Sequence, residues 1–370
     1  MSIMRFTPNT SPTIGVEIEL QLIDAKELVL TSAIDQILTA LPADMRDSVK
    51  PELMQCYIEI NTRICRNVRE VGEDLREKLT RLESIIHPMG VRLLWSGTHP
   101  FSSWRHQKIT NHERYARLVT LMEDVVRQLV TFGLHVHIGV DSGDKAVMVC
   151  DRMLHHLPLL LALSANSPFW EGRNTGLHSN RSKIMEGLPT AGLPYQMRNW
   201  SEYVWLVKHL RETGFINSIR EIWWDIRPHH HFGTVELRVC DVPPCLEHVL
   251  AITALVQCLV HTISNEIDEG TFLSEYHPMM VEQNKWRATR YGADASLVSS
   301  TTFQQRSVPE LVQEMTQRLT PTAVELNCLT ELQSVLRLPA ASGARHQVEI
   351  YEATGSRRKV VEKLLEHPAF

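Results

Sequence analysis

The segment TIGVEIELQL, residues 13–22, decides the fold because it predicts a strand with one apolar face and one acidic face. Apolar side chains occupy every second position, and Glu17, Glu19 and Gln21 stand between them. This period of two is typical of a strand that buries one face. Two carboxylates about 7 Å apart on the other face repel each other unless a cation or base neutralises them. We therefore expect the rest of the chain to supply one.

Three later segments repeat this half-polar pattern, at residues 53–61, 132–140 and 234–241. In each of them apolar side chains alternate with polar ones, so each predicts a strand with one face in the core. The polar face of the first carries Glu59, with Glu52 at the start of the strand. The second carries His135 and His137, and the third carries Glu236 and Arg238.

The segments between these strands predict helices that cover the apolar face of one sheet. We expect an α+β fold with a mainly antiparallel sheet, helices on one face and the other face open. Further strands are expected at 91–96 and 221–227, the latter entering a polar turn at 228–231, and residues 166–194 have the composition of a functional loop. The predicted helices span 33–41, 68–88, 113–129, 145–165 with a bend at Pro158, 200–210 and 246–267.

The composition is that of an ordinary globular protein, with 43% hydrophobic and 22% charged residues. The net charge is −5, and no basic run indicates a nucleic-acid partner. The N-terminus lacks the pattern of a signal peptide, and no run approaches the roughly 18 apolar residues of a membrane span. The seven cysteines include no Cys-x-x-Cys pair and are expected to be reduced. We therefore expect a cytoplasmic protein that binds neither nucleic acid nor a membrane.

The polar faces of the four half-polar strands form an oxygen-rich ligand set if they share one sheet. Carboxylates with one or two imidazoles suit Mg²⁺ or Mn²⁺ better than a structural zinc ion. Magnesium sites leave room for substrate phosphates, and Arg238 beside Glu236 would suit a phosphate oxygen. No Gly-x-x-x-x-Gly-Lys-Ser/Thr loop is present, and no Gly-x-Gly-x-x-Gly follows a strand. A nucleotide would therefore bind through metals and arginines.

Each pattern alone has a plainer interpretation. A Glu-x-Glu strand is most often a solvated face, a His-x-His pair is often satisfied locally, and an exposed Glu-x-Arg pair contributes little energy. Four such strands in one chain favour the metal site. We expect the three histidines at 229–231 to form a solvated turn rather than a zinc cluster, and His155 and His156 to lie at a helix surface or at the edge of the core.

The chain also resembles a known family through motifs that run along nearly its whole length. They read GVEIEL at 15–20, EIN at 59–61 after Glu52, GTHP at 97–100, FGLHVH at 132–137, SNR at 179–181, WDIRP at 224–228, FGTVELR at 232–238, NKWRA at 284–288 and RYG at 290–292. In this order they resemble the carboxylate-amine ligases of the glutamate-cysteine ligase type 2 family. The resemblance implies the glutamine-synthetase-like catalytic fold, a curved antiparallel sheet that binds ATP and two or three Mg²⁺ ions on its concave face.

The same resemblance assigns roles to residues of this chain. We take residues 1–370 as a single catalytic domain with a mostly helical C-terminal portion from about residue 281, and the likeness implies a homodimer. The implied metal ligands are Glu17, Glu19, Glu52, Glu59, His135 and Glu236. The residues implied near the ATP phosphates are His137, Arg227 and Arg238, of which the expected catalytic residues are Arg227 and Arg238. The motifs near the substrate pocket contribute Thr98, His99 and Arg181.

The resemblance implies an ATP-dependent ligase that joins an amino acid carboxylate to an amine. A free carboxylate is a poor electrophile, so transfer of the γ-phosphoryl group of ATP would first make an acyl phosphate, from which the amine displaces phosphate. Glutamate and cysteine are the expected pair, giving γ-glutamylcysteine. Two alternatives stay open. One is a metal-dependent phosphate hydrolase that uses the same acids and arginines, and the other is a non-catalytic protein that binds a magnesium nucleotide.

Overall fold

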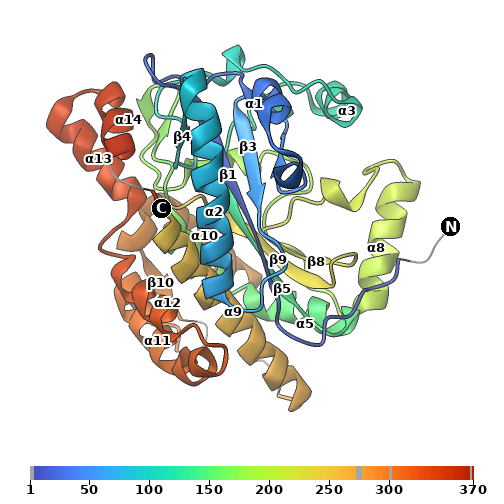
Figure 1. Cartoon of the computed structure of the whole chain (residues 1–370). Helices are drawn as coiled ribbons and strands as arrows, with labels where there is room; N and C mark the ends of the chain where they lie inside the picture. The colour runs from blue at the N-terminus through green and yellow to red at the C-terminus, as the bar shows by residue number, and fades with distance from the viewer. Residues whose placement is uncertain (1–3, 272–276, 300–301, 367–368) are drawn as a thin grey trace.

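The central element is an antiparallel sheet with β1 (Ile14–Asp24) in its middle. The computed structural model describes residues 4–271, 277–299, 302–366 and 369–370 (Figure 1). Seven strands form the sheet in the order β2-β3-β1-β5-β9-β8, with β4 paired to the C-terminal end of β1, and every pair is antiparallel. The other strands of this sheet are β2 (Val49–Lys50), β3 (Tyr57–Asn61), β4 (Val91–Leu94), β5 (Gly133–Gly139), β8 (Ile226–His229) and β9 (Thr234–Asp241).

A layer of helices covers the apolar face of this sheet. Val16, Ile18 and Leu20 of β1 are fully buried in the main core. The long helices α2 (Val68–Ile86) and α9 (Leu246–Asp268) pack against each other and against the sheet, and Figure 1 shows α2 lying along β1 and β3. The expected α+β architecture, with helices on one face of a mainly antiparallel sheet, is confirmed.

The remaining helices surround this core. Those after residue 277 lie together on one side of the molecule in Figure 1. The earlier helices are α1 (Ile34–Ala40), α3 (Glu113–Met122), α4 (Asp124–Arg127), α5 (Gly143–Met153), α6 (Leu157–Ser164), α7 (Asn180–Met185) and α8 (Trp200–Glu212). The later ones are α10 (Pro278–Tyr291), α11 (Val308–Glu325), α12 (Leu329–Ser334), α13 (Gly343–Thr354) and α14 (Arg357–Glu366). Two small hairpins join β6 (Phe169–Trp170) to β7 (Arg173–Asn174) and β10 (Ser296–Val298) to β11 (Gln305–Ser307).

Two predicted helices are interrupted. The helix expected over 113–129 is divided into α3 and α4, because Glu123 between them has a φ of 46°, which an α-helix does not allow. The helix expected over 145–165 is divided into α5 and α6, which meet at 67°. Pro158 lies in the first turn of α6, where the missing N–H of proline is tolerated.

Two predicted strands begin later than expected. The strand expected from residue 53 starts at Tyr57, so Glu52 lies in the preceding loop and not at the start of the strand. The strand expected over 221–227 starts at Ile226 and continues through Pro228 to His229. It is the edge of the sheet, where a proline costs no ladder hydrogen bond.

The expectation that no segment is long and apolar enough for a membrane span is wrong for α9. By length and composition this helix passes that test among the described residues, and so does the bent pair of α5 and α6 if they are taken as one span. However, 72% of the apolar window of α9 is buried inside the protein. Its apolar side chains therefore form the core, as the packing against α2, α5 and β5 requires.

Candidate active site

The register of the sheet brings the four half-polar strands together. β1 pairs with β3 on one side and β5 on the other, and β9 connects β5 to β8. The paired residues on the polar face are Glu19 with Glu59, Glu17 with both Asn61 and His135, His137 with Glu236, and Glu236 with Arg227. The acids and imidazoles predicted from separate segments therefore form one continuous surface.

This surface is the floor of a cavity of about 480 Å³. Most of the predicted site residues line it: Glu17, Glu19, Glu52, Glu59, His135, His137, Arg181, Arg227, Glu236 and Arg238. Further cationic side chains line the cavity from outside the sheet, among them Arg114 of α3 and Arg220. The cavity thus combines an acidic floor with basic groups, which is the charge pattern that a metal-bound phosphate requires.

The closest possible metal ligands come from β1, β5 and β9. The ligand atoms of Glu17, His135 and Glu236 all lie within 4.8 Å of one another. Nδ1 of His135 lies 3.2 Å from Oε2 of Glu17, and Nδ1 of His137 lies 3.0 Å from the Thr234 hydroxyl. These contacts orient both rings, as groups behind metal-ligating histidines commonly do. The Nε2 atoms of both imidazoles are buried and accept or donate no hydrogen bond among the described residues.

The acids of the cavity show the electrostatic cost of being close together. Burial, and then the charge of Glu19, raise the pKa of Glu52 to about 7. Burial and the charge of Glu17 raise the pKa of Glu59 well above its usual range. Burial would also raise the pKa of Glu17, but the neighbouring imidazoles of His135 and His137 outweigh this effect, and the pKa lies well below its ordinary value. A bound cation would relieve the repulsion among the other acids.

The donor atoms present fit a hard divalent cation. Carboxylate oxygens dominate the set, and the two buried Nε2 atoms, which make no hydrogen bond to the described residues, add nitrogen donors. Burial, and then the charge of Arg238, lower the pKa of His135, which keeps this imidazole neutral and able to donate its lone pair. Such a set suits Mg²⁺ or Mn²⁺.

The two arginines beside Glu236 differ in how firmly they are held. Arg227 makes four hydrogen bonds, two to the Glu236 carboxylate and two to the backbone carbonyls of Ile219 and Ile222. Arg238 donates through one Nη atom to Glu236, and its buried Nε has no partner among the described residues. Arg238 therefore has donors left for an anion, whereas Arg227 chiefly holds Glu236 in place. Together they hold the pKa of Glu236 well below its usual range, against the effect of burial.

Arg181 reaches the cavity from α7 and lies across the backbone of Gly133. A Cβ atom at Gly133 would lie 2.2 Å from Nη2 of Arg181, so the glycine makes room for the guanidinium. The Nη atoms of Arg181 lie 3.4 Å from the carbonyl oxygens of Arg238 and Val239, and its Nε has no hydrogen-bond partner among the residues described. Arg181 is 3% exposed, and no carboxylate lies within ion-pair distance of it in the described parts of the chain. It is a buried cation that an anionic substrate could neutralise.

Thr98 and His99 do not line the cavity. The Thr98 hydroxyl donates to the Phe169 carbonyl at 2.6 Å. Nε2 of His99 lies 3.0 Å from the Leu28 carbonyl, and its Nδ1 accepts from two backbone N–H groups. Burial lowers the pKa of His99 to about 3, so this ring is neutral. Both side chains are used to hold loops, which does not support the predicted substrate contact.

A buried carboxylate, Asp241, organises the loop that carries Arg181, and no sequence pattern indicated this role. Its oxygens accept hydrogen bonds from the backbone N–H of Asn166 and from the hydroxyls of Ser167 and Ser179. The Ser167 hydroxyl in turn accepts from the backbone N–H of Arg181 at 3.0 Å. Burial raises the pKa of Asp241. Only the composition of residues 166–194 pointed to a functional loop.

The histidines at 229–231 do not form a fully solvated turn. His229 belongs to β8, lines the cavity and is only partly exposed. Its ring stacks on Phe232, with centroids 4.2 Å apart, and lies 5.6 Å from the ring of His137. Burial lowers the pKa of His229 to about 4. The prediction of a solvated turn is therefore wrong for this residue, because the strand continues beyond Pro228.

Proteins of one family are similar to this chain over almost its whole length. Residues 13–367 match the family described as glutamate-cysteine ligase family 2. A protein of Gloeobacter violaceus, provisionally named glutamate–cysteine ligase 2, is 42% identical over 362 residues, 97% of this chain and 97% of its own. A protein of Frankia alni, provisionally named glutamate–cysteine ligase 2-1, is 41% identical over 367 residues, 98% of this chain and 96% of its own.

Solved structures share the fold at much lower identity. A glutamate–cysteine ligase of Francisella tularensis in complex with AMP superposes with a TM-score of 0.68 at 13% identity, over 99% of this chain and 91% of that one. A bifunctional glutathione synthetase of Pasteurella multocida gives a TM-score of 0.71 at 14% identity. The match covers 96% of this chain but 52% of that enzyme, so the chain spans about half its length. These likenesses confirm the expected glutamine-synthetase-like fold.

Proposed function

Because the chain belongs to the glutamate-cysteine ligase family 2, we propose that it is an ATP-dependent carboxylate–amine ligase. The observation that carries the proposal is the single surface that β1, β3, β5, β9 and β8 build from acids, imidazoles and arginines. Amide formation by such a ligase needs a place where phosphate charge is neutralised next to a bound carboxylate. The acidic floor and Arg238 supply groups for the first, and Arg181 supplies a cation for the second.

The proposed cofactor is Mg²⁺ or Mn²⁺, with ATP as co-substrate. Glu17, His135 and Glu236 would hold one ion, because their ligand atoms lie close together. The oxygen-rich set for a second or third ion would come from Glu19, Glu52 and Glu59. When bound, these ions neutralise the charge of the phosphate oxygens during phosphoryl transfer.

The chain's own residues would bind and orient the reacting groups. Arg238 has free donors beside Glu236 and would bind the transferring phosphoryl group, where charge develops. Arg227 would act by holding Glu236, and His137 would stand beside the phosphates. Arg181 would bind the carboxylate of the acid substrate, since it is buried and no carboxylate of the described residues lies within ion-pair distance of it. Attack by an amine on the resulting acyl phosphate breaks the carbonyl C–O bond and releases phosphate.

We propose glutamate as the acid and cysteine as the amine, giving γ-glutamylcysteine. The names of the relatives support this pair. A cytoplasmic location and a homodimer remain part of the proposal through the same family likeness.

The test is ADP release from Mg-ATP while amino acids are supplied singly and in pairs, with mass detection of any new amide. ADP and γ-glutamylcysteine are expected together, and only when glutamate and cysteine are both present. A different coupled amide would keep the ligase and change its substrates. ADP release without an amide would identify a hydrolase, and ATP binding without ADP release would identify a non-catalytic nucleotide-binding protein.

A matched pair of variants tests whether the sheet surface carries this activity. Glu17→Gln removes one proposed metal ligand while keeping the size of the side chain, and we expect turnover to fall at least about 100-fold. Glu171→Gln makes the same change at a carboxylate that pairs with Arg105 outside the cavity, and it should leave turnover unchanged. Equal turnover in the two variants would contradict the assignment.

A further inference from the structure

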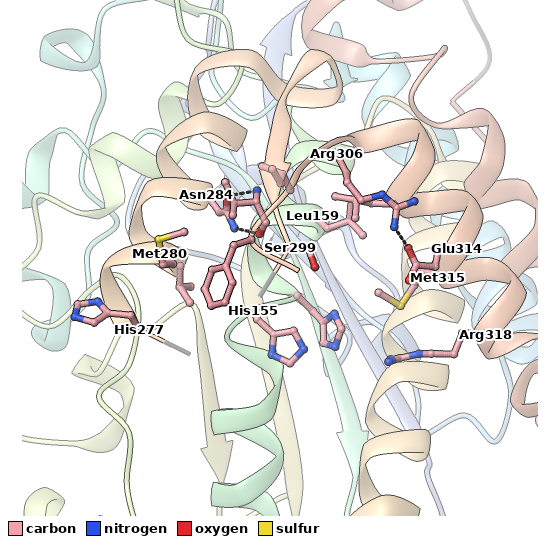
Figure 2. Close-up of a pocket in the computed structure, with 16 residues that line it drawn as sticks. His155, Leu159, His277, Met280, Asn284, Ser299, Arg306, Glu314, Met315 and Arg318 are labelled. Carbon is pink, nitrogen blue, oxygen red and sulfur yellow. Dashed lines mark hydrogen bonds and ion pairs between the residues drawn. The ribbon is translucent and has the colours of Figure 1, made fainter. Parts of the chain in front are cut away.

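A second cavity, of about 260 Å³, lies apart from the acidic cavity and shares none of its lining residues among those described. Its walls come from the junction of α5 and α6, from α10, from the hairpin of β10 and β11, and from α11 (Figure 2). Asn284 fixes two of these walls, because its side-chain amide donates to the Val298 carbonyl and accepts from the Val298 N–H, both at 2.8 Å. The cavity is therefore built by packed elements rather than by one loose loop.

One wall of this cavity holds an imidazole without a hydrogen-bond partner. His156 is 6% exposed, and neither of its ring nitrogens makes a hydrogen bond within the described ranges of the chain. Its nearest polar ring is that of His155, with centroids 3.9 Å apart. The ring nitrogens of His156 are not among the fully buried unpartnered atoms, so they keep access to the cavity and are available to a ligand there.

The charged groups around His156 favour an anion. Arg318 of α11 lines the cavity and has no carboxylate within ion-pair distance among the residues that the structure describes. The nearby acid Glu314 is already paired with Arg306, as Figure 2 shows. Burial, with a smaller contribution from the charge of Arg318, lowers the pKa of His155 to about 4, so this ring adds no positive charge of its own. The unbalanced charge of the cavity is therefore the guanidinium of Arg318.

The remaining surface of the cavity is largely apolar. Leu159, Met280, Met315 and Phe303 contribute to its lining. Methionine side chains adapt their shape to different ligands, and an aromatic side chain at the rim can cover an apolar ligand. A bare inorganic anion would leave this surface without a partner.

We propose that this second cavity binds a small carboxylate with an apolar body, whose carboxylate pairs with Arg318 and accepts a hydrogen bond from His156. The apolar body lies against Leu159, Met280 and Met315. The size of the cavity limits the ligand to a small molecule, since drug-sized ligands occupy about 300 Å³ or more. The site is independent of the proposed ligase activity, because it needs neither ATP nor a metal ion.

Calorimetric titration of the full chain with 3-phenylpropionate, without ATP or divalent cations, tests this site. Saturable binding is expected, and the uncharged 3-phenylpropionamide should bind at least about tenfold more weakly, because it cannot form the charge-assisted hydrogen bond to Arg318. Inorganic phosphate should bind no better than the amide, since it has no apolar body.

Two arginine variants locate the binding. Arg318→Gln should weaken 3-phenylpropionate about tenfold without unfolding the protein, because Arg318 is exposed on α11. Arg211→Gln removes an exposed arginine of α8, which does not line the cavity, and should leave the affinity unchanged. Absence of saturable binding, equal affinity for acid and amide, tighter binding of phosphate, or no effect of Arg318→Gln would each overturn the proposal.

Discussion

Gly133 illustrates how one backbone position determines where a cation of the active site lies. Its missing side chain leaves the space that the Arg181 guanidinium occupies. Gly133→Ala would place a carbon 2.2 Å from Nη2 of Arg181, so the guanidinium must move. We expect kcat/KM for the acid substrate to fall at least about tenfold, which corresponds to losing about 1.4 kcal/mol of binding to the reacting complex.

The double variant separates this effect from damage to the strand. In an Arg181→Met background, Gly133→Ala should change kcat/KM little further, because both changes remove the same interaction. Steady-state kinetics and thermal unfolding of the four proteins measure this. Full additivity of the two losses would show that Gly133 does not act through Arg181.

Glu236 is a poor position for testing the metal site by substitution. Glu236 is almost fully buried and pairs with both Arg227 and Arg238. Removing its charge leaves two buried arginines without their partner, so a variant at this position loses stability as well as any metal ligand. Glu17, which is partly exposed and pairs with imidazoles, is the better position for testing the metal site.

The sequence predicted the direction of side chains well on regular strands and poorly in loops. The period of two placed Glu17, Glu19, His135 and His137 on one face, as the structure has them. In loops no period fixes the direction of a side chain, so motif position alone put Thr98 and His99 near the substrate. Their polar atoms in fact bind the backbone of neighbouring loops.

At the scale of elements, Lys285 joins α10 to the end of α7 and to the residue before β8. It is 4% exposed, and its ammonium lies 2.5 Å from Oδ2 of Asp225 and 2.8 Å from Oε1 of Glu186. Lys285→Met should lower the free energy of unfolding by about 3–5 kcal/mol, since two carboxylates lose their buried partner. Denaturant titration followed by fluorescence measures the loss.

Lys183→Met is the matched control, because Lys183 pairs with the same Glu186 but is more exposed. Exposed ion pairs contribute little, so this change should cost less than about 1 kcal/mol. Similar losses of unfolding free energy in the two variants would mean that burial does not determine how much each lysine's ion pairs stabilise the fold.

The breaks within elements were harder to predict than the elements themselves. The apolar period of residues 113–129 continues past Glu123, although the chain leaves the helical conformation there. Local periodicity reports which side chains are buried, and it does not report a single residue with positive φ. The late start of β3 has a similar cause, because the apolar residues before Tyr57 are buried without joining the ladder.

At the scale of the whole molecule, the acidic surface predicts that divalent cations stabilise the fold. Mg²⁺ bound to the native state alone should add about 2.7 kcal/mol of stability at a concentration 100 times its Kd. Thermal unfolding with Mg²⁺ and with EDTA measures this difference. The stabilisation should be largely lost in Glu17→Gln and kept in Glu171→Gln, and an equal effect from NaCl at the same ionic strength would contradict a specific site.

The order of the strands could not be derived from periodicity. Residues 13–22 and 234–241 are far apart in the chain, and nothing in their alternation shows that β5 lies between them. The sequence analysis predicted that these strands share one antiparallel sheet, which the register confirms, but it did not predict their order. Pairing between distant strands depends on the packing of the whole core, which a local pattern does not contain.

The most direct test of the proposed reaction follows an oxygen atom from the acid to the phosphate. The acid substrate is labelled with ¹⁸O in both oxygens of its reacting carboxyl group and is turned over with Mg-ATP and the amine. If the carboxylate attacks the γ-phosphoryl group and the amine then displaces phosphate, each phosphate released carries one ¹⁸O, which mass spectrometry detects. Phosphate without ¹⁸O would contradict an acyl phosphate and, with it, the proposed ligase mechanism.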